Sequence, residues 1–254
     1  MDTKLKLQIE NHKGRSAVAY SYFTSPLKIG TPNMQGERLQ LVLMMASAGV
    51  LKGDNFQYEI NCAENTKAMI TEQSYTKIFD TGNEAAKKHM EIRLEGNASL
   101  YYRPSAVIPF AGSSFDGSMT VRLDKESEFV CSDILAAGRV GMGEQFAFLH
   151  YRNRVCVMVE DKPVWLDNCY LQPEKMDLTK MVFLDGYTHQ GTFYYYGKKE
   201  KQEKLLAYET KGKVMLAKTS AAAGVCIRVL ANTAQDIEEE FAQLEYSIES
   251  EISY

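Results

Sequence analysis

Alternation of apolar and polar residues with a period of two dominates this chain, and it predicts β-strands with one buried face. The alternating segments 4–10 and 16–23 flank a turn at residues 11–14 and predict a hairpin. Similar alternation recurs in residues 56–60, 67–71, 90–94 and 117–123. The continuous apolar run 39–46 instead predicts a strand that is buried on both faces.

Three closely spaced strands are also predicted in the second half of the chain, over residues 146–150, 154–160 and 164–171. Arg152 and Asn153 form the predicted turn between the first two, and Asp161-Lys162-Pro163 the predicted turn before the third. Strands this close together favour antiparallel pairing over β-α-β units. The pattern therefore predicts an all-β fold with mainly antiparallel strands.

Signals for helices are few. Residues 128–138 predict one short helix that ends at Gly138, and residues 199–208 suggest another. The strongest signal is C-terminal, where Thr233 is the predicted N-cap of a helix with the apolar stripe Ile237, Phe241, Leu244 and Ile248. No repeat or low-complexity linker divides the chain, so residues 1–254 are expected to form a single domain.

Composition and charge narrow the class of protein. Of the 254 residues 45% are hydrophobic and 24% are charged, which are ordinary globular values. The net charge of −4 argues against nucleic-acid binding, since the one dense lysine run, 198–204, is broken by Glu200 and Glu203. The longest apolar run, residues 39–51, is too short to cross a membrane.

The cysteines indicate a reducing compartment. Their number is odd and they are far apart in the sequence, at Cys62, Cys131, Cys156, Cys169 and Cys226. The first ten residues also lack the apolar segment of a secretory signal. We therefore expect a cytoplasmic protein with no membrane association.

Motifs for catalysis are absent from the sequence. It contains no G-x-S-x-G elbow, no C-x-x-C pair and no phosphate-binding loop. A carbohydrate-active hydrolase or a lectin-like module with an all-β fold stays open as an alternative, because pairs of acidic residues can cleave glycosides. The candidate carboxylates are Asp54, Glu59, Glu72, Asp116 and Glu144.

A series of short motifs resembles the urease accessory protein UreD family, which is called UreH in some systems. In chain order the motifs are Ser25-Pro26-Leu27, Ala48-Gly49-Val50, Gly53-Asp54, Gln73, Lys77-Ile78-Phe79, Ile108-Pro109-Phe110, residues 133–139 with Gly138 and Arg139, Gly143-Glu144-Gln145-Phe146 and residues 224–230. No single motif is decisive, but their order and spacing extend over about two hundred residues. The chain departs from the family pattern at Ala48, Glu64 and Glu72, where the family tends to have glycine, alanine and threonine.

The resemblance implies a β-helix-like stack of sheets with two helices, and a scaffold rather than an enzyme. It implies a hetero-oligomer with UreF, through which it would be dimeric, and with the GTPase UreG, and this complex would insert nickel into apo-urease. Nickel would pass transiently through the protein, with no tightly bound cofactor and no fixed metal site. Asp54, Lys77 and Glu144 are the expected polar residues of that route.

Overall fold

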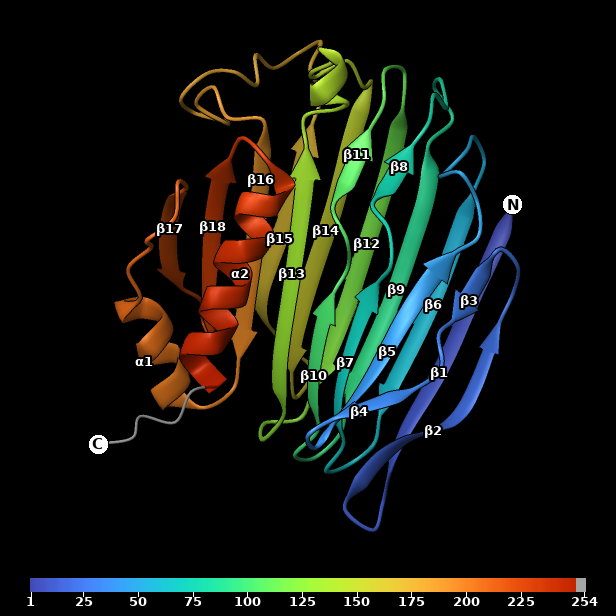
Figure 1. Cartoon of the computed structure of the whole chain (residues 1–254), viewed down its shortest axis with the longest axis vertical. Helices are drawn as coiled ribbons and strands as arrows, with labels where there is room; N and C mark the ends of the chain where they lie inside the picture. Colours follow the sequence, from blue (N-terminus) through green and yellow to red (C-terminus); the bar gives the residue numbers. More distant parts are fainter. Residues whose placement is uncertain (250–254) are drawn as a thin grey trace.

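The chain passes back and forth between two β-sheets that pack face to face (Figure 1). The computed structural model describes residues 1–249. Sheet A has, in spatial order, β15 (Lys162–Leu171), β14 (His150–Val159), β12 (Ser114–Leu123), β9 (Ala86–Leu94), β6 (Asn55–Cys62), β1 (Asp2–His12) and β2 (Arg15–Phe23).

Sheet B is the larger of the two. Its main path runs β17 (Met215–Ser220), β18 (Val225–Ala231), β16 (His189–Tyr196), β13 (Glu128–Ala136), β10 (Ser99–Arg103), β7 (Lys67–Glu72), β5 (Arg38–Met45) and β3 (Leu27–Ile29). Three short strands join it, β4 (Asn33–Gln35), β8 (Thr76–Ile78) and β11 (Val107–Pro109). The helices are α1 (Lys199–Ala207), α2 (Ala234–Glu249) and the 3₁₀ turn η1 (Val140–Met142). None of the helices in residues 1–249 is long and apolar enough to cross a membrane.

Strand direction follows from the coiling of the chain. From β6 to β14 successive long strands alternate between the sheets, so neighbours within one sheet run parallel, as in β6–β9–β12–β14 and β5–β7–β10–β13. Antiparallel pairs lie outside these parallel runs, in the predicted N-terminal hairpin β1–β2, in the pair β14–β15 and along β13–β16–β18–β17 of sheet B. The expected all-β stack of sheets is confirmed, whereas antiparallel pairing is wrong for the centre of both sheets.

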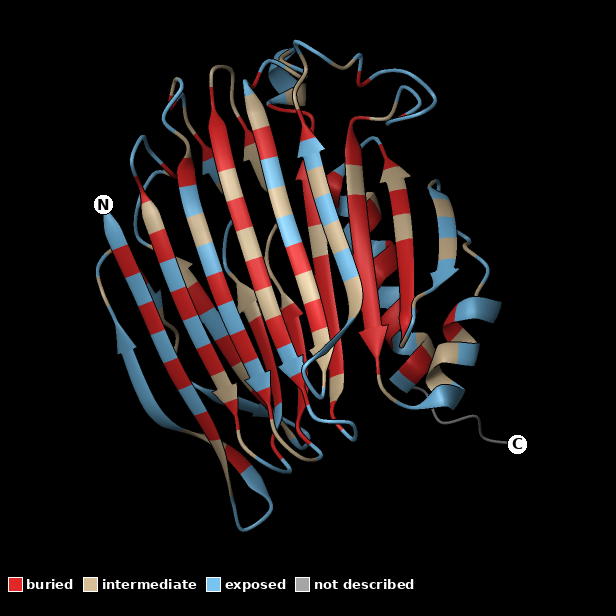
Figure 2. Ribbon diagram, turned by 180° about the vertical axis from the view of Figure 1, so that it is seen from behind, coloured by how far each residue is buried: buried red, intermediate tan, exposed pale blue. Residues whose placement is uncertain are grey.

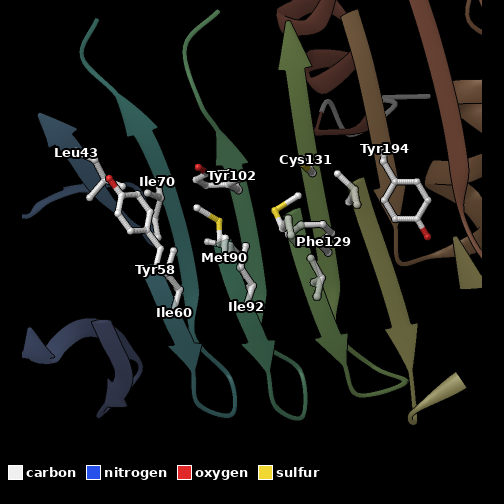
Figure 3. Packing of buried hydrophobic residues seen from close by; sticks show 14 of the residues in the cluster. Leu43, Tyr58, Ile60, Ile70, Met90, Ile92, Tyr102, Phe129, Cys131 and Tyr194 are labelled. Atoms are coloured by element: carbon white, nitrogen blue, oxygen red, sulfur yellow. The ribbon is translucent and has the colours of Figure 1, made fainter. Parts of the chain in front are cut away.

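In-register pairing arranges the interior into rows of side chains. Within sheet A one row is formed by Tyr58, Met90 and Met119, and within sheet B one row is formed by Ile70, Tyr102 and Cys131. Figure 3 shows side chains of both sheets projecting into this shared interior. Because the side-chain period of a strand is two, every second residue of each central strand enters the core.

The outer face of sheet A is open to solvent. Figure 2 shows buried and exposed positions alternating along its strands, and β1 has the strictest alternation. Charged and polar side chains such as Lys6, Glu59 and Glu91 line this outer face. The segments 4–10, 56–60, 90–94 and 117–123 are therefore confirmed as half-buried strands of sheet A. Segment 16–23 is the largely exposed edge strand β2, and 67–71 lies in β7 of sheet B, where three successive residues are buried.

The outer face of sheet B is instead covered by α2, which creates a second core (Figure 1). Ile237, Phe241 and Leu244 of α2 pack on apolar side chains of β13, β16 and β18. Gly191 permits this close approach, since a Cβ there would lie 2.5 Å from a methyl carbon of Ile237. The predicted N-cap is also present, because the Thr233 hydroxyl oxygen accepts a hydrogen bond from the Asp236 amide at 3.1 Å.

Burial on both faces explains one wrong prediction. Residues 128–138 do not form a helix but contain the strand β13 (Glu128–Ala136). One face of β13 points toward sheet A and the other lies beneath α2, so nearly all of its residues are apolar or buried and no alternation remains. A short apolar run of this kind cannot be distinguished from a helix by periodicity alone. The second predicted helix is confirmed as α1 (Lys199–Ala207).

Two other expectations also need correction. The run 39–46 is buried on one face only, because β5 lies beyond the cover of α2 and leaves Val42 36% exposed. Arg152 and Asn153 lie inside the continuous strand β14 and form no turn, whereas the chain does turn at Glu160 and Asp161, beside the second turn predicted at residues 161–163. The predicted three strands are therefore two.

Removing the Phe241 side chain tests how far α2 contributes to stability. Phe241→Ala should lower the free energy of unfolding by about 3–5 kcal/mol, since the ring is buried against β16 and a cavity would remain. Urea unfolding followed by circular dichroism measures the loss. Tyr246→Ala, on the exposed side of the same helix, should change stability by less than about 0.5 kcal/mol. Equal losses in the two variants would contradict the packing described here.

Candidate functional site

Three contacts that each involve a carboxylate cross the mostly apolar space between the sheets, beside a weaker contact from the Gln190 amide to the Cys169 sulfur. Lys88 of β9 donates to Glu72 of β7 with an Nζ–Oε1 distance of 3.0 Å. Asn153 of β14 donates to Asp133 of β13 at 3.1 Å. The third contact joins Arg228 of β18 to Asp167 of β15 at 2.7 Å. These six residues, each contact joining one sheet to the other, are called the polar layer below.

Strand register explains why polar groups collect at this level. In sheet A, Lys88 and Asn153 are both paired with Gly117 of β12, so they occupy one row. In sheet B, Asp133 is paired with Thr192, which is paired with Arg228. Inward positions on either side of this level are mainly apolar in each strand. The polar layer therefore interrupts an otherwise mainly apolar pattern, with Asp167 one row away because it pairs with Val155.

Two cavities meet at the polar layer. The larger, of about 530 Å³, extends from residues 47–50 and 72–77 to apolar side chains of β3, β5 and β6. The smaller, of about 80 Å³, contains Gly117 and reaches Asp133, Asn153 and Asp167. A Cβ at Gly117 would come within 2.8 Å of the Asn153 side-chain oxygen, so this glycine keeps space open between Lys88 and Asn153.

Lys88 stays charged in this setting. Burial opposes the ammonium form, but the combined interactions with Glu72, Tyr102 and Tyr58, of which Glu72 contributes most, outweigh it and raise the pKa of Lys88 well above its ordinary value. The Lys88 nitrogen also lies 5.2 Å from the centre of the Tyr58 ring, within range of a cation–π interaction. Burial raises the pKa of Tyr58 to about 12, so this phenol is neutral at physiological pH.

The far end of the polar layer combines the partly buried carboxylates of Asp133 and Asp167 with the guanidinium group of Arg228. Burial raises the pKa of Asp133, and the nearby Asp167 carboxylate adds to the rise. Burial also raises the pKa of the thiols of Cys131 and Cys169, so neither is prepared as a thiolate ligand. Within residues 1–249 no three His, Cys, Asp or Glu side chains are grouped to hold a metal ion. The chemistry offered is that of dispersed oxygen ligands.

The residues predicted from the sequence lie in three places. Lys77 and Gln73 line the larger cavity, where both are solvent-exposed. Asp54 lies outside both cavities in a tight turn that begins at Leu51. Its carboxylate accepts hydrogen bonds from the Leu51 amide at 2.8 Å and the Met1 amino group at 3.0 Å. The turn-capping role, which is common for aspartate after a glycine such as Gly53, is the one that the structure gives to Asp54.

Glu144 belongs to a separate cluster at one end of the sheets. It accepts two hydrogen bonds from the Arg139 guanidinium group, and Arg139 lowers the pKa of Glu144. Arg139 also stacks on the ring of Phe110, 4.5 Å from its centre. A Cβ at Gly138 would lie 2.9 Å from the Glu144 carbonyl oxygen, and Gly143 has the positive φ of 76° that ends η1.

The other motif residues brace the same end of sheet B. Pro109 of β11 is paired with Ile78 of β8, and Ile78 bridges to Val50. The Phe79 and Phe110 rings meet edge to face with centres 5.0 Å apart. Gly49 allows this packing, because a Cβ there would lie 2.6 Å from both Phe79 and the Lys77 carbonyl. Most of the motifs singled out from the sequence thus shape the backbone beside the larger cavity.

Sequence reasoning missed the residues that fill the polar layer, with the exception of Glu72, which was noted as a departure and as a candidate carboxylate. A usable signal existed, because the inward positions of β9 read Ala86, Lys88, Met90, Ile92 and Leu94. A single lysine among four apolar residues marks a buried charge. The pairing of that lysine with Glu72 depends on the coiling of the chain, which the pattern does not give.

Comparison with known proteins identifies the family. A family model described as UreD urease accessory protein matches residues 1–252. The chain belongs to the UreD urease accessory protein family. It is 32% identical over 245 residues to the urease accessory protein UreD of Acetivibrio thermocellus, covering 93% of each chain. It is 35% identical over 190 residues to UreH of Helicobacter acinonychis, covering 74% of this chain and 72% of that protein.

Membership in the UreD family confirms the resemblance read from the ordered motifs. The part of the chain that the UreD family model matches includes the segments that contain Gly53, Pro109 and Gly143 as well as the C-terminal helix α2. The family gives the chain an accessory role in urease maturation.

Asp133→Asn should stabilise the folded protein at neutral pH. The fold raises the pKa of Asp133 above its ordinary value of 3.8, so its neutral form is favoured and its contribution to stability is lost as pH rises through the raised pKa. At pH 7.5 an amide avoids the cost of the buried charge, and we expect a gain of about 1 kcal/mol. Thermal unfolding at several pH values measures it.

The gain from Asp133→Asn should shrink as the pH is lowered toward 4, because the native carboxyl then becomes neutral as well. Asp185→Asn, at an exposed position, is the matched control and should show no such trend. Destabilisation by Asp133→Asn at every pH would contradict the assignment of a buried, disfavoured charge.

Proposed function

We propose that this protein is a non-enzymatic scaffold that hands nickel to apo-urease in a complex with UreF and the GTPase UreG. The observation that carries the proposal is the polar layer, which places three carboxylates and two cavities inside a framework of the UreD family. Membership in the family supports the accessory role in urease maturation. That the ion is nickel and that the partners are UreF and UreG is our proposal.

The chemistry of the polar layer suits an ion in transit. Glu72, Asp133 and Asp167 offer oxygen atoms to a hydrated divalent cation, but each is already held by a cationic or amide partner. A passing ion must therefore compete with an internal hydrogen bond at each step, which keeps every binding event weak. A conduit needs such weak binding, because an ion that bound tightly would not be released.

Lys77 and Gln73 extend this proposed route to the mouth of the larger cavity. Asp54 and Glu144 are not part of this proposed route. The Asp54 carboxylate stabilises a turn, and the Glu144 carboxylate binds Arg139. The route therefore runs from residues 73–77 past Glu72 to Asp133. It replaces the one expected from the three residues singled out in the sequence.

A role as a glycoside hydrolase is supported less well. Of the five carboxylates considered for that chemistry, only Glu72 lines either inter-sheet cavity. That mechanism needs two carboxyl groups facing one sugar. The proposed compartment is the cytoplasm, which agrees with the five free cysteines of the chain.

Complementation tests the proposal. We expect this protein, expressed with a urease operon that lacks its own D component, to restore nickel-dependent urease activity and to co-purify with UreF and UreG. Failure to restore activity, with protein that is present and folded, would overturn the nickel-delivery role. Hydrolysis of a glycan by the purified chain alone would support the alternative.

Blocking the smaller cavity should impair that activity. Gly117→Val fills the space between Lys88 and Asn153, and we expect urease activation to fall at least fivefold while the melting temperature shows that the fold persists. Gly141→Val is the control, because no heavy atom lies within 4 Å of its added Cβ. Full activation by a folded Gly117→Val protein would exclude the smaller cavity from the route.

A further inference from the structure

The Glu72–Lys88 ion pair stands where the two inter-sheet cavities meet. Both cavities are lined by Glu72, Thr76, Lys88 and Phe115. An ion that moved from the larger cavity to the smaller would have to pass this contact. The pair is therefore placed to control movement between the two cavities.

The two partners differ in how firmly they are held. The Glu72 carboxylate accepts the Tyr102 hydroxyl at 3.4 Å as well as Lys88 at 3.0 Å, and its side chain is 13% exposed. Lys88 is 26% exposed on a flexible four-carbon stem. Its ammonium group already lies over the Tyr58 ring, 5.2 Å from the centre, so the ring face in the larger cavity can hold it when the contact with Glu72 is broken.

We propose that Lys88 is a charge gate, which a divalent cation opens by taking its place on the Glu72 carboxylate. The displaced ammonium group keeps its contact with the Tyr58 ring and returns to Glu72 when the ion has passed. This inference rests on the proposed function, because nickel is the ion expected to use the route. It assigns the step to two residues, one of which, Glu72, stands where the family tends to have threonine.

A lysine gate has two physical consequences. The positive charge of Lys88 repels an approaching cation, so occupancy of the smaller cavity stays low until the exchange occurs. The returning ammonium group also competes for the carboxylate and shortens the time that the ion stays. Without the lysine, Glu72 would be an uncompensated carboxylate beside two cavities and would retain the ion.

Nickel binding by gate variants tests the proposal. Equilibrium dialysis of the full chain against NiCl₂, with UreF present if solubility requires it, measures the affinity. Lys88→Met should tighten nickel binding at least fivefold, and the double variant Glu72→Gln with Lys88→Met should return it to the native value. Lys87→Met is the matched control, since Lys87 precedes the gate lysine and is exposed on the opposite face.

Chemical labelling follows the gate in the native protein. Acetic anhydride modifies uncharged amines, and mass spectrometry gives the labelling rate of Lys88 relative to Lys87. Nickel should raise this ratio at least threefold, because displacement from Glu72 removes the attraction that keeps the Lys88 ammonium group protonated. MgCl₂ at the same concentration should have a smaller effect, since Mg²⁺ gives up its water ligands reluctantly.

Unchanged nickel affinity in a folded Lys88→Met protein, or an unchanged labelling ratio in the native protein, would overturn the gate. If Lys88→Met does not fold, the labelling experiment decides alone. Complementation is scored separately on the native chain. An overturned gate with restored urease activity leaves the nickel-delivery role intact, whereas a failed complementation with folded protein removes that role whatever the binding results.

Discussion

In-register pairing in two sheets whose central strands are parallel is the constraint on which this structure depends. Each coil of the chain contributes one strand to each sheet, and the pairing fixes which side chains share a row across successive coils. A shift of one residue in a single strand would exchange its inner and outer faces. Lys88, Gly117 and Asn153 share a row only because three separate strands keep this register.

The sequence predicted the half-buried strands well, because their alternation directly reflects one apolar and one polar face. It failed where a strand is covered on both sides, as in β13, since burial beneath α2 removes the polar half of the pattern. The direction of the strands could not be predicted either, because a local pattern does not show which strands become neighbours. For the same reason the contact between Glu72 and Lys88 could not be predicted. The ordered motifs identified the family, although most of them, such as Gly49 and Gly138, shape the backbone rather than bind an ion.

The polar layer combines structural and functional demands that usually conflict. Buried charges cost free energy unless they are paired, and here each carboxylate has one partner from the opposite sheet. That pairing joins the sheets in an otherwise apolar interior. The same partners leave each carboxylate with unused lone pairs that face a cavity, so the layer can hold the sheets together and still exchange partners.

The place of α2 in the chain order has a consequence for biosynthesis. Residues 234–249 leave the ribosome after every strand of sheet B. Phe193, Tyr195 and Ile227 therefore stay exposed to water until α2 has been synthesised and packs on them. Apolar surface left open in this way makes a nascent chain prone to aggregate. Production of soluble protein should therefore be most vulnerable in the last moments of translation, and a premature stop shortly before residue 234 should cause precipitation rather than yield a shortened scaffold.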